Sequence, residues 1–183
     1  LRINAHQADI AMRKAWDKIK PGLTEENIAL AIQNSFSDQG ALPQFSIVAS
    51  GSNSAFPHHK TGSRKLKEGD AIVIDLGGKF EGYASDITRM SSIGAPAKDY
   101  ALIHQIVEDA VCAAMAAARP GQIAKNVDKA AREVIEKAGF GKYFVHRTGH
   151  GIGTEIHEPP FITSTSETIL EPGMVFTIEP GIY

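Results

Sequence analysis

Cysteine, charge of one sign and long hydrophobic runs are all scarce in this sequence, and each scarcity excludes something. The 183 residues include one cysteine, Cys112, so no internal disulfide can form, and we expect a buried thiol in a cytoplasmic protein. A net charge of −2 without a block of like charges gives no reason to expect nucleic acid or an anionic membrane as a partner. The longest apolar run, residues 110–118, is about half of the ~20 residues that a membrane-spanning helix needs.

The remaining composition is that of an ordinary globular protein, and the length suits one domain with a full-sized core. The spacing of apolar residues and the Pro-Gly and Gly breaks predict a strand over about 44–50 and helices over about 5–20, 25–38, 99–119 and 126–138. Thr24 is expected to cap the second helix, with Asn27 in place of the usual Glu or Gln of a capping box.

The stretch DAIVIDLGGKFEGYASDITR, residues 70–89, predicts a β-hairpin with an acid on each strand. An apolar run ends in Asp75, Gly77-Gly78 supply the turn signal, and a second extended segment carries Asp86. Two carboxylates that face one another repel, and a cation or a shared proton between them relieves the repulsion. Asp75 and Asp86 are therefore candidate metal ligands, although Asp is also common as an ordinary turn or capping residue.

The chain also repeats itself at a shift of ninety-nine positions. The shift superposes helix breaks, apolar positions and His58 on His157, and after a five-residue insertion it places Asp75 on Glu179. We therefore expect two related halves, with Asp75 and Glu179 near a pseudo-twofold axis and His58 and His157 on either side of them. The alternative is chance identity among the abundant Ala and Gly residues.

The same symmetry places a counterpart of Asp86 shortly after Gly181, whereas the sequence stops at Tyr183. We expect this chain to be cut within its own active site and to lack a further carboxylate. Because a missing bridging carboxylate weakens metal affinity and leaves charge repulsion unrelieved, a chain ending at Tyr183 is expected to hydrolyse peptides poorly or not at all.

The segment HRTGHGIGTEIHEPP carries His146, His150 and His157, with glycines that let the backbone approach closely around His150. It matches neither a nucleotide-binding glycine pattern nor the HExxH zinc spacing. Carboxylates with one nitrogen ligand suit manganese, cobalt, iron or zinc, and two such ions about 3.5–4 Å apart support hydrolysis of a carbonyl compound. The other three histidines are assigned structural roles: His6, His59 and His104.

Four ordered motifs together resemble the Xaa-Pro dipeptidases (prolidases) and Xaa-Pro aminopeptidases, with methionine aminopeptidase more distant. They are SGSNSAFPHH, DLGGKFEGYASDITR, HRTGHGIGTEIHEPP and the final IEPGIY. The resemblance implies an α+β, pita-bread fold, with two pseudo-symmetric helix-plus-hairpin halves around a curved antiparallel sheet. It also implies that residues 1–183 are one catalytic domain truncated at both ends, without an N-terminal domain and the last metal-ligand strand.

The resemblance further implies roles for single residues and a reaction. Asp75 would bind one metal, Asp86 would bridge two, and His150 and Glu179 would bind the second. Three histidines would contact the substrate: His58, His146 and His157. The implied enzyme uses two divalent ions, with manganese or cobalt expected in preference to zinc or iron. It cleaves a peptide or dipeptide between the N-terminal residue and a following proline. A homodimer is expected, because it is the common symmetric assembly.

This interpretation has three alternatives. One is a methionine-type aminopeptidase, the more distant resemblance, and a dipeptidase is not separated from an aminopeptidase that acts on longer peptides. Creatinase-like amidinohydrolases share the fold without the metal carboxylates, which the acids present here disfavour. A non-catalytic peptide- or protein-binding module of the same fold stays open for a chain ending at Tyr183.

Overall fold

Residues 1–183, which the computed structural model describes in full, divide at Lys98 into two units, Leu1–Lys98 and Asp99–Tyr183. The first contains α1 (Arg2–Lys18), α2 (Glu25–Asp38), β1 (Leu42–Ser50), a 3-10 helix η1 (Gly51–Ala55), β2 (Ala71–Phe80), β3 (Tyr83–Ala84) and β4 (Ile87–Ser92). The second contains α3 (Tyr100–Ala117), α4 (Ala124–Lys137), the 3-10 helix η2 (Gly141–Tyr143), β5 (Gly149–Gly151) and β6 (Glu158–Ile162). Among these helices, none combines the length and the apolar character needed to span a membrane.

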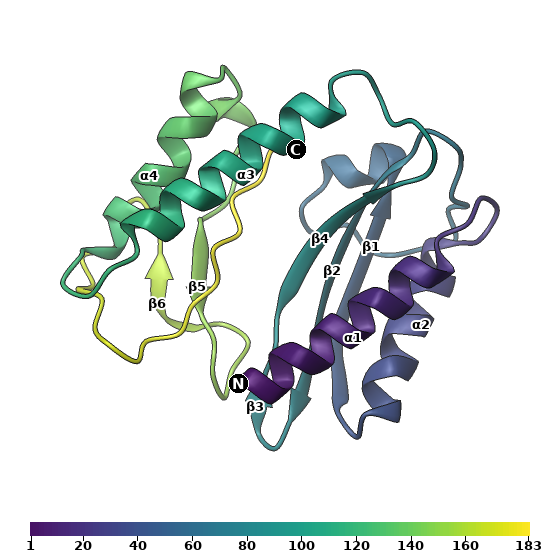
Figure 1. Ribbon diagram of the computed structural model, residues 1–183, viewed down its shortest axis with the longest axis horizontal. Helices are drawn as coiled ribbons and strands as arrows, with labels where there is room; N and C mark the ends of the chain where they lie inside the picture. Colours follow the sequence, from purple (N-terminus) through teal and green to yellow (C-terminus); the bar gives the residue numbers. More distant parts are fainter. The chain divides into compact units, whose positions relative to one another are not determined.

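Strand β2 is the centre of the antiparallel sheet in the first unit. It pairs with β1 on one side and with β3 and β4 on the other, and α1 and α2 pack along one face of this sheet (Figure 1). Successive side chains of a strand point to opposite faces. Ile72, Ile74 and Leu76 are accordingly fully buried against the helices, while Asp75 lies half-buried on the other face.

The position of the hairpin turn differs from the expectation. Gly77-Gly78 do not form the turn, because β2 continues through both to Phe80 and the chain reverses at Glu81-Gly82. A Cβ at Gly78 would lie 2.5 Å from the Phe36 ring. These glycines are therefore sites of close approach within a strand rather than turn residues.

The predicted start of α2 is confirmed. Thr24 caps the helix: its hydroxyl accepts from the Asn27 main-chain N–H at 3.2 Å, and the Asn27 side chain accepts from the Thr24 N–H at 2.9 Å. Main-chain N–H groups in the first turn of a helix have no partner within the helix itself, and the two side chains supply acceptors for them. This reciprocal pair fixes the first residue of α2, Glu25, whose side chain is buried.

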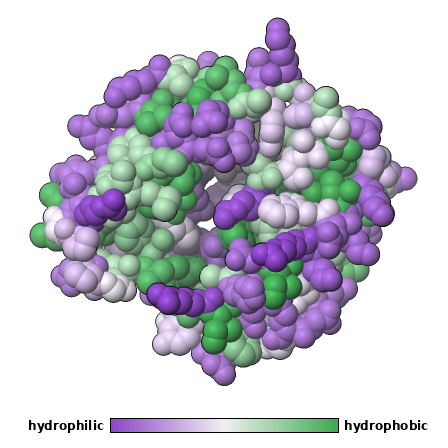
Figure 2. Space-filling view, viewed as in Figure 1, coloured by the Kyte–Doolittle hydropathy of each residue, from purple (hydrophilic) through white to green (hydrophobic).

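In the second unit, α3 and α4 pack around their own core. Its buried members lie on both helices and on the segments that follow them: Ala110, Ala114, Ala124, Val127, Ala131, Ile135, Phe144, Ile162 and Leu170. The outer surface of α3 is largely apolar (Figure 2), and its Leu102 and Met115 are both more than half exposed. Cys112 on this helix is exposed, so the expectation of a buried thiol was wrong.

The internal repeat is confirmed in the backbone of the two units. A shift of ninety-nine positions carries the bounds of α2 onto those of α4. The isolated bridge between Thr24 and Lys65 has its equivalent between Ile123 and Ile169, which also reproduces the five-residue insertion. The two units therefore share one internal plan of two helices and a returning segment hydrogen-bonded beside the second.

Replacing Gly78 by alanine tests the close approach within β2. The new Cβ would force the fully buried Phe36 ring to move, and we expect a loss of about 1–3 kcal/mol in the free energy of unfolding, measured by urea denaturation. The matched control is Gly62→Ala, where a Cβ has nothing nearer than the Lys60 carbonyl oxygen at 3.8 Å. Equal stability of the two variants would contradict this account.

Candidate metal centre

Asp75 and Asp86 share one face of the sheet in the first unit. Asp75 pairs with Thr88 across the ladder, and the Thr88 hydroxyl donates to Asp75 Oδ1 at 2.8 Å. The same register runs from the β3 pairs to the β4 pairs and places Asp86 opposite Gly77, two residues along β2 from Asp75. Both carboxylates are half-buried on the face opposite the apolar core. The predicted acids are thus diagonal neighbours, with Asp75 on β2 and Asp86 in the link between β3 and β4 rather than on a strand.

Gly77 allows the link between β3 and β4, which contains Asp86, to lie close to β2. A Cβ at position 77 would lie 2.3 Å from the Ser85 carbonyl oxygen and 2.3 Å from the Phe45 ring. Ser85 in turn is tied to Gly78, since its main-chain N–H donates to the Gly78 carbonyl at 2.8 Å. Ser85, the residue before Asp86, is therefore fixed by backbone contacts of both its N–H and its carbonyl group.

In the second unit, a short antiparallel ladder brings His150 to Glu179. The Glu179 N–H donates to the Thr148 carbonyl at 2.8 Å, and the Thr177 N–H donates to the His150 carbonyl at 2.7 Å. Gly149 permits this approach, because a Cβ there would lie 1.9 Å from the Thr177 carbonyl oxygen. The prediction that glycines let the backbone approach closely around His150 is confirmed.

His150 and Glu179 present a nitrogen and an oxygen side by side. His150 is buried, and its Nε2 lies 3.1 Å from Glu179 Oε1. Its Nδ1 lies 3.0 Å from the Gly151 carbonyl oxygen, which can only accept, so Nδ1 carries a proton and Nε2 is the ring nitrogen that faces the Glu179 carboxylate. Fixing the tautomer through the second ring nitrogen is the usual arrangement of a metal-binding histidine.

The ionised form of Glu179 is favoured by its surroundings. Burial alone would raise the pKa of this carboxyl, but hydrogen bonds from His150 and Thr177 and the nearby His146 outweigh it, so the pKa lies below its usual range. The Thr177 hydroxyl donates to Glu179 Oε1 at 2.8 Å and accepts from the His150 main-chain N–H at 3.0 Å. Thr177, which the sequence analysis did not select, thus orients both candidate ligands.

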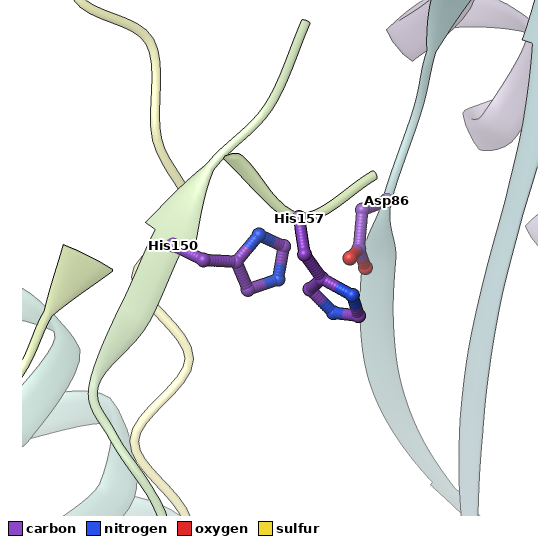
Figure 3. Close-up of side chains that lie close together, drawn as sticks. All are labelled: Asp86, His150 and His157. Atoms are coloured by element: carbon purple, nitrogen blue, oxygen red, sulfur yellow. The ribbon is translucent and has the colours of Figure 1, made fainter. Parts of the chain in front are cut away.

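The other two histidines of this segment lie differently. The His157 ring is exposed and meets the His150 ring edge to face, with the centroids 4.2 Å apart (Figure 3). The half-buried His146 ring lies between Phe144 and Tyr183, with ring centroids 5.2 and 5.3 Å away, and its Nδ1 is 2.8 Å from the Arg147 carbonyl oxygen. His157 is therefore beside the candidate ligand pair, whereas His146 is held by aromatic neighbours.

The donors in both units fit divalent first-row metal ions. One unit offers two carboxylates on one face of a sheet, Asp75 and Asp86. The other offers His150 Nε2 beside the ionised carboxylate of Glu179. Carboxylate oxygen with imidazole nitrogen is a donor set for manganese, iron, cobalt or zinc and lacks the thiolate that softer ions prefer.

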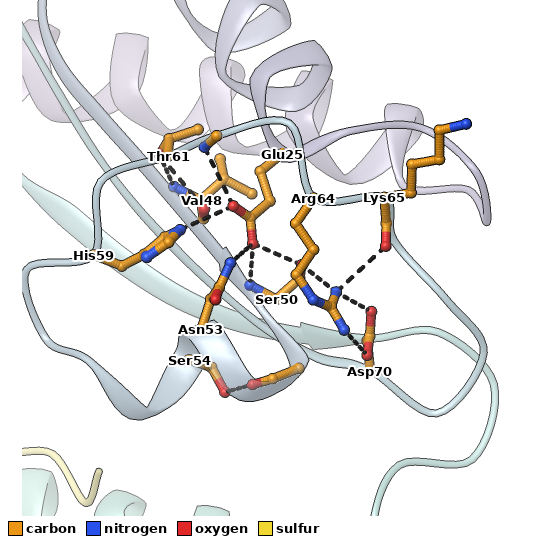
Figure 4. A network of polar contacts seen from close by, with 12 residues as sticks. Glu25, Val48, Ser50, Asn53, Ser54, His59, Thr61, Arg64, Lys65 and Asp70 are labelled. Atoms are coloured by element: carbon orange, nitrogen blue, oxygen red, sulfur yellow. Dashed lines mark hydrogen bonds and ion pairs between the residues drawn. The ribbon is translucent and has the colours of Figure 1, made fainter.

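His58 lies exposed in the loop after η1, and a buried network lies beneath this loop (Figure 4). His59 contributes to it through Nε2, 2.9 Å from Oε2 of the fully buried Glu25, which confirms its structural role. Arg64 joins the network by donating to the Ser50 hydroxyl at 2.7 Å, and it also forms a two-pronged pair with Asp70 at 2.6 and 2.9 Å. This network was not predicted.

A second buried carboxylate supports the candidate ligands of the second unit. Asp128 of α4 accepts from the Thr148 N–H and hydroxyl at 3.2 and 2.8 Å. Arg132, one turn later, pairs with Asp128 at 3.0 Å and donates to the His146 carbonyl at 3.1 Å. The segment leading to His150 is thus fastened to α4. An Asp four residues before an Arg on a helix was the available sequence signal, and it is typical of a surface pair as well.

Known structures share this architecture. A solved Xaa-Pro dipeptidase from Bacillus anthracis matches with a TM-score of 0.98 and 39% sequence identity, over 100% of this chain and 52% of that one. A prolidase from Pyrococcus furiosus matches with a TM-score of 0.96 and 43% identity, over 98% of this chain and 54% of that one. The chain therefore has the pita-bread fold of prolidases and aminopeptidase P, and the expected fold class is confirmed.

Sequence comparison defines the family. The pattern of metallopeptidase family M24 matches residues 1–183. A probable dipeptidase PepE from Mycobacterium tuberculosis is 48% identical over 165 residues, which cover 89% of this chain and 44% of that protein. The chain belongs to metallopeptidase family M24. It spans about half the length of the curated relatives it matches.

Replacing Gly149 by alanine tests the ladder that brings His150 to Glu179. The new Cβ would overlap the Thr177 carbonyl, which is backbone and cannot turn away, so we expect at least about 10-fold weaker binding of Mn²⁺ in a calorimetric titration. The control is Gly153→Ala, whose Cβ would meet only the movable end of the Glu158 side chain. Unchanged affinity in Gly149→Ala would exclude the ladder as the device that aligns the pair.

The Arg64–Asp70 pair predicts a pH-dependent contribution to stability. Hydrogen bonding from Arg64 lowers the pKa of Asp70 against the opposing effect of burial. The pair therefore stabilises the fold above the unfolded pKa of about 3.9, and this contribution is lost as pH falls through the lower folded pKa. We expect Asp70→Asn to reduce the free energy of unfolding by about 1.5–3 kcal/mol at pH 7.

The measurement for Asp70→Asn is urea unfolding between pH 7 and the acid limit of folding. The difference in the free energy of unfolding between Asp70→Asn and the unmodified protein should become smaller only in acid. The control Asp9→Asn, at an exposed position of α1, should have the same free energy of unfolding as the unmodified protein at every pH. A gap that stays constant with pH would show that the ionised pair is not its source.

Proposed function

We propose that the protein carrying this chain is a peptidase, dependent on two divalent metal ions, that hydrolyses the bond between an N-terminal residue and a following proline. The observation that carries the proposal is the His150–Glu179 pair, with 3.1 Å between Nε2 and Oε1 and with Nδ1 held by the Gly151 carbonyl oxygen. The pair occurs in a chain of metallopeptidase family M24. Over 96% of this chain and 51% of the other protein, it is 44% identical to an Xaa-Pro dipeptidase of Pyrococcus furiosus.

We further propose Asp75, Asp86, His150 and Glu179 as the metal ligands, with manganese or cobalt as the ions. When bound, two such ions lower the pKa of a water molecule and stabilise the attacking and leaving atoms of the hydrolysis. Two features of this chain support the assignment: the acids of the first unit share a sheet face, and the pair in the second unit is held by Thr177.

Three histidines are proposed to act on the substrate: His58, His146 and His157. Each is at least partly exposed and carries ring nitrogens that can donate to a peptide carbonyl. A donor aimed at the oxygen on which charge develops stabilises the transition state more than the bound substrate, so these residues are expected to affect kcat. The contact between the His157 ring and the ring of His150, with centroids 4.2 Å apart, supports the proposed role of His157.

The test is hydrolysis of Ala-Pro, Met-Ala and a longer Xaa-Pro peptide by the complete protein, stripped of metal and then supplied with manganese or cobalt. We expect metal-dependent cleavage before proline. Since loss of a residue that merely supports a metal ligand costs about 10- to 100-fold, Asp86→Ala should lower kcat/KM at least about 100-fold. Asp38→Asn, at an exposed position at the end of α2, is the control and should leave the rate unchanged.

Preference among the three peptides separates the remaining possibilities. Cleavage of Met-Ala alone would replace the proposal by a methionine-type aminopeptidase, and preference for the longer peptide would assign an Xaa-Pro aminopeptidase. Absence of hydrolysis with any metal would favour a binding module of the same fold.

A further inference from the structure

The loop that carries His58 is anchored from below by one buried carboxylate, Glu25 at the start of α2. Its Oε1 accepts three hydrogen bonds, from the Ser50 N–H and hydroxyl at 2.8 and 2.7 Å and from the Asn53 side chain at 2.9 Å. Its Oε2 accepts from His59 Nε2 at 2.9 Å and from the Gly62 N–H at 3.3 Å. Five donors surround a side chain without solvent exposure (Figure 4).

These donors come from the whole length of the loop. Ser50 ends β1, Asn53 lies in η1, and His59 and Gly62 lie in the segment that returns toward β2. The network therefore closes residues 50–62 onto the N-terminus of α2. Burial alone would raise the pKa of Glu25, but the hydrogen bonds from Ser50, Asn53 and His59 outweigh it and hold the pKa below its usual range.

His58 immediately precedes the anchored His59, while its own side chain is exposed. Phe56, two residues earlier, is 63% exposed. The buried side of the loop is thus fixed by Glu25, and its exposed side carries the His58 imidazole and the Phe56 ring. Because consecutive Cα atoms are 3.8 Å apart, fastening the side chain of His59 restricts where the backbone of His58 can lie.

We infer that Glu25 is a positioning residue, which through His59 holds the loop 50–62 so that the His58 imidazole stays in one place and orientation for the substrate. The inference rests on the proposed role of His58 in peptide hydrolysis. A displacement of about 1 Å at a reacting group can cost about 100-fold in rate, so a rigid anchor beneath the loop has a direct catalytic consequence.

A purely structural role for Glu25 makes different predictions. If the carboxylate only stabilised the fold, its loss would affect every substitution background alike. If it acts through His58, its loss should matter only while His58 is present, because coupled residues are not additive. The two cases are separated by combining variants at Glu25, His59 and His58.

The first experiment observes His58 without any reaction. Histidine ring NMR signals are recorded from the complete, metal-free protein with labelled histidine, and the His58 signal is assigned by its loss in His58→Ala. Glu25→Gln and His59→Ala should shift or broaden this signal, whereas His59→Gln should restore it, because an amide can still donate to Glu25. The His6 signal, from an exposed position of α1, is the internal reference.

The matched control is Glu26→Gln, since Glu26 neighbours Glu25 in the first turn of α2 and is exposed. It should leave the His58 signal unchanged. A His58 signal that is unchanged in both Glu25→Gln and His59→Ala would overturn the inference. If Glu25→Gln does not fold, the comparison of His59→Ala with His59→Gln still decides it.

The second experiment measures kcat and KM for Ala-Pro with the manganese-loaded complete protein. Glu25→Gln and His59→Ala should lower kcat about 10- to 100-fold with a smaller change in KM, and His59→Gln should recover most of the loss. In the His58→Ala background, the further loss should be no more than about twofold. An equal loss in both backgrounds would overturn the inference.

Failure of the proposed function has a different signature. If the unmodified protein hydrolyses none of the three peptides with manganese or cobalt, the peptidase proposal fails. The NMR comparison then decides alone whether Glu25 positions His58: a displaced signal supports the positioning role, and an unchanged one removes it.

Discussion

A carboxylate taken out of water must be surrounded by hydrogen-bond donors, and this requirement shapes both units of the chain. Glu25 collects five donors from the loop that follows β1. Asp128 collects donors from Thr148 and from Arg132 on its own helix. In each unit the second helix provides the acid and an irregular segment provides donors, so the buried charge fastens a histidine-bearing segment to a rigid element.

Close backbone approach is the second requirement, and glycine meets it on both sides of the candidate chemistry. Gly77 lets the Ser85 carbonyl lie against β2 next to Asp86, and Gly149 lets the Thr177 carbonyl lie against the strand that carries His150. In both places a backbone carbonyl oxygen excludes a side chain, and at Gly77 the Phe45 ring excludes it as well. The residues that present the candidate ligands are therefore held by main-chain contacts, which vary less than side-chain conformations do.

Much of the fold follows from local patterns. The helices, the Thr24 capping box and the repeat at ninety-nine positions were all readable, because breaks and caps are decided within a few residues. The predicted turn at Gly77-Gly78 was wrong. Two consecutive glycines are typical of a turn, and the sequence does not show that Phe36 and Phe45, which are distant along the chain, fill the space beside them. The motifs and the repeat predicted the candidate ligands. They did not predict the residues that hold these ligands in place, such as Thr177 and Asp128.

The anchoring residues escaped prediction for a physical reason. An acid in the first turn of a helix, such as Glu25, is ordinarily an exposed complement to the helix dipole, and only the folded chain shows that it is buried. Strand β2 shows a related dependence. Its even-numbered residues fill the core while Asp75 lies on the other face, so a slip of one residue would move the acid inside and the core outside. A chain in which β2 packs stably enough to resist proteolysis therefore already has Asp75 on the face of the sheet opposite the core.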